Sequence, residues 1–194
     1  MRARRALASC VVVAAAAVTA PADDGTGAGA EAASVRAAAA RAPAAVWHEA
    51  VEPRIYPTMP ERLRAKLEEG FQLAVARVRE SETCRGLFAR FGADGLETLA
   101  TGVYFPVESY RREVEVCGRN DAPGSRAAGN LAFTFVGGSR TFLCRRFAWA
   151  PTEVAAAAVI HEALHHAGLT EQPHDRHAMA STEITAMVEE ACGF

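Results

Sequence analysis

Residues 159–171 of the 194-residue chain read Val159-Ile160-His161-Glu162-Ala163-Leu164-His165-His166-Ala167-Gly168-Leu169-Thr170-Glu171. Pro151 before this stretch suits a helix start and Gly168 a helix end, which predicts a helix over 152–167. On that helix His161 and His165 lie within about 40° of each other, on one face. Two imidazoles at this spacing can bind one zinc ion.

Glu162 follows the first histidine and lies about 100° around the helix from it. At that angle its carboxylate is poorly placed to be a metal ligand and borders the coordination position left open. There it can accept a proton from a water molecule that attacks a carbonyl group. The pattern therefore predicts His161 and His165 as metal ligands and Glu162 as a general base.

The rest of the chain predicts a helix followed by a block of strands, and after the motif helix a loop and a last helix. Apolar residues recur at helical spacing over 61–80, and 86–95 is a turn-rich segment that could hold a second short helix. A short last helix is expected over 182–191. Strand character is found at 103–106, 113–117, 131–136 and 140–143, with a Gly-Gly-Ser hairpin turn before the last. We expect an α+β fold with an N-terminal helix, a small and mostly antiparallel sheet, the motif helix and a short C-terminal helix.

The stretch from His161 to Glu171 resembles the extended metzincin motif of the zincin metallopeptidases, His-Glu-x-x-His-x-x-Gly-x-x-His. In that family the glycine turns the chain after the helix, and the last motif residue returns as the third zinc ligand. Some members have Asp there; this chain has Glu171, and carboxylates also bind zinc. The resemblance implies a zincin-like fold with zinc held by His161, His165 and Glu171. Met179 stands in the range of the family's Met-turn but lacks its sequence context.

Other residues could supply the third ligand. In the gluzincin branch a Glu on a later helix does so, and Glu183 would take that role here. His174 and His177 could bind the metal or stabilise an oxyanion, although exposed loop histidines are common. His166 lies on the same side of the helix as Glu162 and either supports the site or is a surface residue.

The segment from His161 to Gly193 also resembles a group of exported bacterial proteins. They share His-Glu-x-Leu-His-x-x-Gly-Leu-x-Glu-x-Pro, then Glu-Ile-Thr and a terminal Cys-Gly. Here the further matching residues are Leu164, Leu169, Pro173, Glu183-Ile184-Thr185 and Cys192-Gly193. This resemblance implies a zincin-like fold and no particular substrate.

The N-terminus is organised like an export signal. Arginines at positions 2, 4 and 5, an apolar run and small residues up to Ala22 predict a signal peptide over 1–22. The Ala- and Gly-rich segment 23–46 predicts a linker or short pro-segment, and 47–194 a catalytic domain. A lipid anchor on Cys10 is the alternative, but the apolar run follows this cysteine instead of preceding it. We expect a secreted or periplasmic protein.

Four cysteines follow the signal segment: Cys84, Cys117, Cys144 and Cys192. An even number in an exported chain predicts two disulfides, and the absence of a Cys-x-x-Cys pair disfavours a zinc cluster. Of the three possible pairings we favour Cys84–Cys117 with Cys144–Cys192. The second bond would tie the C-terminal end to the strand before the motif helix.

The charge balance excludes some classes of partner. Lys and Arg number 21 against 23 Asp and Glu, and no basic block suggests nucleic-acid binding.

The apolar run of the signal segment is short for a membrane span. We expect a monomer with no stable membrane association.

These patterns predict a secreted zinc metallopeptidase that hydrolyses a peptide or protein substrate. The zincin resemblance implies a substrate lying along the edge strand from the 131–144 hairpin, as an added strand. The alternative is an exported zinc-binding protein with the same fold and no catalysis. A third possibility is a small disulfide-stapled protein in which the motif is accidental.

Overall fold

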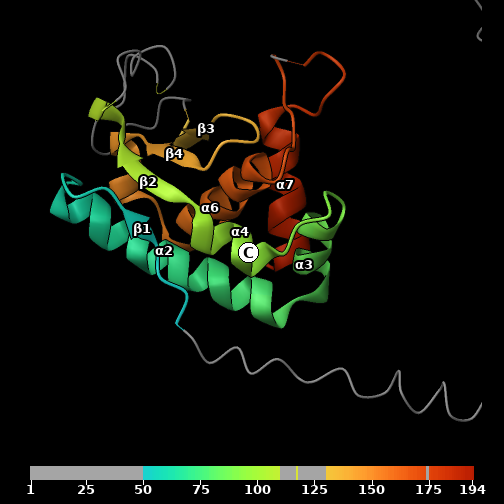
Figure 1. Ribbon diagram of the computed structural model, residues 1–194, viewed down its shortest axis with the longest axis horizontal. Helices are drawn as coiled ribbons and strands as arrows, with labels where there is room; N and C mark the ends of the chain where they lie inside the picture. Colours follow the sequence, from blue (N-terminus) through green and yellow to red (C-terminus); the bar gives the residue numbers. More distant parts are fainter. Residues whose placement is uncertain (1–49, 110–116, 118–129, 174) are drawn as a thin grey trace, which may run out of the picture. The chain divides into compact units, whose positions relative to one another are not determined.

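The computed structural model describes residues 50–109, 117, 130–173 and 175–194. These residues form an α+β architecture with five α-helices and a four-stranded sheet (Figure 1). The motif helix α6 (Thr152–His166) is central, because it packs on α2 (Glu61–Glu80), on α7 (Ser181–Cys192) and on strand β3 (Ala132–Thr134). None of the helices in the described ranges is long and apolar enough to cross a membrane.

Helix α2 has the bounds that the apolar periodicity predicts, Glu61–Glu80. It starts directly after Pro60 and buries one stripe of side chains, among them Leu63, Leu67, Phe71 and Val78. A Cβ on Gly70 would lie 2.9 Å from the Cβ of Ala155. Small residues on both helices therefore let α2 and α6 pack backbone to backbone.

Two short helices follow α2, α3 (Glu82–Ala89) and α4 (Gly95–Thr101), and they overlap the ends of the expected turn-rich segment 86–95. Each has a side chain at its N-terminus that satisfies a free backbone N–H. The hydroxyl of Ser81 accepts from Cys84 N at 3.1 Å, and the carboxylate of Asp94 accepts from Glu97 N at 2.9 Å. These two caps are the local signals that divide the segment into helices.

The sheet is mixed, so the expectation of a mostly antiparallel sheet is wrong. Its strand order is β1 (Arg54–Ile55), β2 (Val103–Pro106), β4 (Arg140–Leu143), β3. The 131–144 hairpin is antiparallel as expected, but β4 also pairs in parallel with β2, and β2 with β1. The hairpin turn fixes only its own two strands, whereas the pairing of β2 with β4 joins segments over 30 residues apart. The strand expected over 113–117 falls outside the described residues except for Cys117.

The disulfide pairing also differs from the expectation. Two disulfides are present, but they join Cys84 with Cys192 and Cys117 with Cys144. Helices α3 and α7 pack together, which places the Cα atoms of Cys84 and Cys192 4.6 Å apart. The C-terminal end is therefore tied to α3, and not to the strand before the motif helix. Ser81 Oγ adds to this junction by donating a hydrogen bond to Ala191 O at 2.9 Å.

Candidate metal centre

The motif lies on α6 and the turn that follows it. The helix ends at His166, within one residue of the expected end, and Gly168 adopts a φ of +105°. This backbone conformation is open to glycine and costly for other residues. It lets Leu169 N donate to Leu164 O at 2.9 Å, which reverses the chain toward Glu171.

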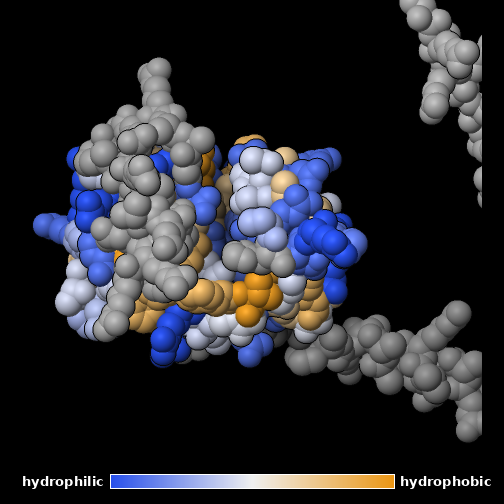
Figure 2. Space-filling model, turned by 90° about the horizontal axis from the view of Figure 1, so that it is seen from above, coloured by the Kyte–Doolittle hydropathy of each residue, from blue (hydrophilic) through white to orange (hydrophobic). Residues whose placement is uncertain are grey.

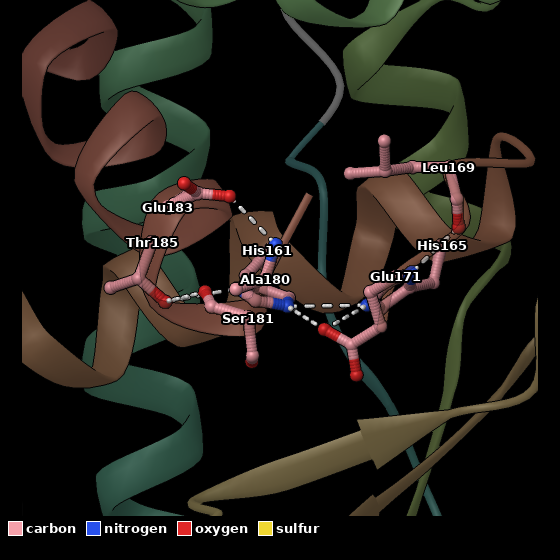
Figure 3. Close-up of polar contacts among 8 residues, drawn as sticks. All are labelled: His161, His165, Leu169, Glu171, Ala180, Ser181, Glu183 and Thr185. Atoms are coloured by element: carbon pink, nitrogen blue, oxygen red, sulfur yellow. Dashed lines mark hydrogen bonds and ion pairs between the residues drawn. The ribbon is translucent and has the colours of Figure 1, made fainter. Parts of the chain in front are cut away.

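Three side chains converge where this turn brings Glu171 back toward α6 (Figure 3). The Nε2 atoms of His161 and His165 lie 3.1 Å apart, and Glu171 Oε2 lies 3.4 Å from the first and 3.6 Å from the second. Both histidines are buried, with 5% and 3% of their surface exposed. The structure thus brings together the three residues predicted as metal ligands, and this group could hold a metal ion.

Hydrogen bonds on the far side of each ring determine where its proton lies. The Thr185 hydroxyl donates its only proton to Ser181 O at 3.1 Å, so it can only accept from His161 Nδ1 at 3.0 Å. His165 Nδ1 lies 2.7 Å from Leu169 O, a carbonyl that can only accept. In the neutral rings both protons are therefore on Nδ1, which leaves a lone pair on each Nε2.

The centre consequently presents three acceptors to one another and no donor. Glu171 Oε2 is buried and has no hydrogen-bond partner within the described residues, and the two Nε2 lone pairs face it. Acceptors that converge in a buried site repel each other unless a cation lies between them. Two imidazole nitrogens and one carboxylate oxygen are a donor set that suits zinc.

The loop that carries Glu171 is held by backbone pairing with Met179. These two residues form an isolated parallel bridge, and Gln172 N donates to Met179 O at 3.0 Å. Met179 therefore stabilises the segment of the third candidate ligand. Burial acts to raise the pKa of Glu171, but when His161 and His165 are protonated their hydrogen bonds and positive charge outweigh it and hold this pKa far below its usual range.

Glu162 lies next to this centre and is itself buried, with 6% of its surface exposed. Burial raises the pKa of its carboxyl group, while His161, His165 and the hydroxyl of Thr134 act to lower it. Its Oε2 atom has no hydrogen-bond partner among the residues that the structure describes. A carboxyl group whose pKa is raised by burial is suited to accept a proton near neutral pH.

The centre opens into a pocket of about 420 Å³. One wall is residues 130–134, the β3 edge of the sheet, and the other is the face of α7 from Ser181 to Glu189. The floor is α6, where Ala157 and Ala158 leave space beside the histidines as their small size suggests. In the space-filling view a groove with hydrophobic surface on its walls divides this side of the molecule (Figure 2).

The side of strand β3 opposite β4 faces this pocket with its backbone N–H and C=O groups. All five residues from 130 to 134 line it, so the contact is made by the strand's edge as well as its side chains. Leu131 O accepts from Cys144 N, and Phe133 is in register with Phe142. Because backbone groups alternate in direction along a strand, the N–H and C=O groups of Ala132 and Thr134 point away from β4.

The alternative ligands lie elsewhere or outside the described residues. Glu183 accepts a hydrogen bond from Ala180 N at 2.8 Å and so caps the start of α7. His177 is exposed and does not belong to the metal-ligating group, and His174 is not described.

His166 is half-buried and hydrogen-bonded inside the fold, so the surface interpretation of this residue is wrong. Its Nε2 lies 3.0 Å from Thr141 Oγ1, and burial is the main cause that lowers its pKa to about 4.

Three polar residues near the site were not singled out from the sequence. Thr185 belongs to the Glu-Ile-Thr segment of the second resemblance, which was the available signal for it. Thr134 and Thr141 lie on neighbouring strands and were interpreted only as strand residues. Their contact with each other, at 2.8 Å between hydroxyl oxygens, depends on strand register.

Comparison with known proteins gives no family for this chain: no family model matches it, nor does any curated protein or solved structure.

Proposed function

We propose that the chain is an exported zinc metallopeptidase that hydrolyses peptide bonds in extended segments of peptides or proteins. One observation carries the proposal: two buried imidazole lone pairs and an orphaned carboxylate oxygen converge beside a buried glutamate, at the floor of an open pocket. Three protein ligands leave a coordination position free, which distinguishes catalytic zinc sites from structural ones.

His161, His165 and Glu171 would hold the metal. A bound zinc ion supplies Lewis-acid chemistry, because it lowers the pKa of a water molecule and polarises a carbonyl group. Glu162 accepts the proton of the attacking water on its carboxylate and later delivers it to the leaving amine. Its burial supports both roles, since a raised pKa makes the protonated form accessible during turnover.

Among the residues that the structure describes, β3 has no strand paired on its outer side, and this edge would bind the substrate. An extended peptide can pair with the outward backbone groups of Ala132 and Thr134, which extends the sheet by one strand. This pairing would carry the peptide across the floor of the pocket, past Glu162. Backbone hydrogen bonds form with any substrate sequence. The side chains that line the pocket walls would therefore set the preference for particular substrate side chains.

Export of the protein is supported by two features. The disulfides Cys84–Cys192 and Cys117–Cys144 form and persist in oxidising compartments. The basic and apolar pattern over 1–22 fits a signal peptide.

The test is cleavage of an unfolded protein substrate by the zinc-loaded protein and by its Glu162→Gln variant. We expect the variant to bind zinc like the wild type and to lose at least about 100-fold in kcat, the usual contribution of a general base. Equal activity in the two proteins would overturn the assigned mechanism. Stoichiometric zinc with no turnover in the wild type would instead favour a zinc-binding protein without catalysis.

A further inference from the structure

The pocket beside the candidate metal centre extends along α6 and α7, away from His165. On α6 its lining continues from His161 to Val154, two helical turns and about 10 Å along the axis. On α7 it starts at Ser181 and passes Thr185, which contacts His161 on the side of that ring away from His165 (Figure 3). The lining of α7 ends one turn further along, about 6 Å, at the acidic side chain of Glu189.

The passage between the centre and Glu189 is aliphatic. Its walls include Ala157, Ala158 and Val154 on α6, and Ala186 on α7. Val154 keeps 40% of its surface exposed, so an occupant of the pocket can cover apolar area that water now contacts. This passage is suited to the methylene stem of a long side chain.

The carboxylate of Glu189 is available to such an occupant, because it forms no hydrogen bond or ion pair within the part of the chain that the structure describes. Glu162 and Glu171 also line the pocket, whereas no Lys or Arg of the described ranges does. The other acidic residues of α7 differ from Glu189: Glu183 caps the helix start, and Glu190 does not line the pocket. This distribution of charge favours a cationic occupant over an anionic one.

We propose that Glu189 is a specificity-determining residue that selects peptide substrates with an arginine or lysine side chain beside the scissile bond. The methylene stem of that side chain lies along the aliphatic passage, and its cationic end pairs with the carboxylate of Glu189. This inference rests on the proposed function, since it names the class of peptide that the same site would cleave.

The first test compares peptides that differ only by arginine or its neutral isostere citrulline, placed in turn at the positions on either side of the cleaved bond. At one of these positions we expect kcat/KM to be about three- to fivefold higher for arginine, as for an exposed ion pair. Glu189→Gln should abolish the preference. The matched control Glu190→Gln, one residue along the same helix, should retain it. No preference in the wild type, or an equal preference in Glu189→Gln, would overturn the inference.

Reversal of the charge gives a second variant. In Glu189→Arg we expect citrulline to be preferred over arginine at the same position, because like charges then meet in the pocket. Salt should weaken the preference of the wild type, since it screens the charge of an exposed carboxylate. An arginine preference that persists in Glu189→Arg would show that the selection has another origin.

A binding measurement separates this inference from the proposed function. Fluorescence anisotropy of the two labelled peptides on the zinc-loaded Glu162→Gln protein should give an affinity about three- to fivefold higher for arginine, and Glu189→Gln on that background should remove the difference. Equal affinity for the two peptides would overturn the inference, whether or not the wild type cleaves them. Tighter binding of the arginine peptide that depends on Glu189, with no cleavage by the wild type, would overturn the proposed function and support the cation-selective pocket.

Discussion

The Nε2 atoms of His161 and His165 lie 3.1 Å apart in a buried site, although the other nitrogen of each ring already donates its proton. Helix periodicity puts the two rings on one face, but their orientation comes from groups outside that helix. Thr185 on α7 fixes His161, and the carbonyl of Leu169 after the glycine turn fixes His165. The candidate metal centre is therefore shaped by three segments of the chain.

Removal of the Thr185 hydroxyl should weaken zinc binding. In Thr185→Val, His161 loses the acceptor that holds its proton on Nδ1, so its Nε2 is no longer committed to the metal. We expect the zinc affinity to fall about 10- to 100-fold, the usual effect of removing such a partner. Competition titration with a chelator measures this, and Thr185→Ser should bind like the wild type. Equal affinity in the Val variant would show that packing alone orients the ring.

The glycine turn should be necessary for both stability and metal binding. In Gly168→Ala a side chain is forced at a φ of +105°, so we expect the free energy of unfolding to fall by about 1 kcal/mol or more. Zinc affinity should fall as well, because Glu171 lies three residues further along. Gly86→Ala is the matched control, since Gly86 is inside α3 with open space around its Cβ position. Chemical denaturation measures the free energy of unfolding of both variants, and we expect a loss only in Gly168→Ala. Equal losses in the two variants would contradict a special role of the turn.

His166 should make stability depend on pH in the acid range. Its pKa is lowered to about 4 by burial and by the charge of His165, against 6.5 for an unperturbed histidine. The unfolded chain therefore binds one more proton than the folded one between these values. The stability gained from the neutral ring is complete above about pH 6.5 and is lost progressively as the pH falls toward 4.

His166→Gln should remove that contribution. Denaturation at a series of pH values between about 4 and 6.5 should give a shallower slope of unfolding free energy in the variant than in the wild type. Glu171, whose pKa is also lowered, titrates in both proteins and does not contribute to the difference. Identical slopes would mean that His166 is protonated as readily in the folded state as in the unfolded chain.

Proline at position 132 should impair substrate binding and leave the sheet intact. The N–H of Ala132 points away from β4, so Ala132→Pro removes a donor for the substrate and no hydrogen bond of the hairpin. We expect kcat/KM for an extended peptide to fall about tenfold, the value of one backbone hydrogen bond, with unchanged zinc content. Phe133→Pro, which breaks a hairpin bond, should instead destabilise the fold. Unchanged kcat/KM in the first variant would argue against pairing along this edge.

The sequence predicts those parts of the fold that depend on local signals. Helices α2 and α6 follow from apolar periodicity and flanking prolines, and the approach of Glu171 to the histidines follows from Gly168. Each of these signals lies within a few residues of the feature it determines. The third candidate ligand was named from the resemblance to the extended metzincin motif, in which this glycine precedes the last ligand.

The remaining features depend on pairings between distant segments. The parallel alignment of β2 with β4 and the Cys84–Cys192 disulfide arise from how elements pack, and no local pattern encodes them. The contact between Thr134 and Thr141 needs the strand register, so it could not be inferred beforehand.

The most direct test of the account is the zinc content of the purified, oxidised protein beside His161→Ala, Glu171→Ala and Glu183→Gln. We expect one zinc per chain in the wild type and in Glu183→Gln, whose side chain only caps α7. His161→Ala should hold none, and Glu171→Ala should bind far more weakly. No zinc in the wild type after reconstitution, or full retention in His161→Ala, would contradict the proposed metal centre.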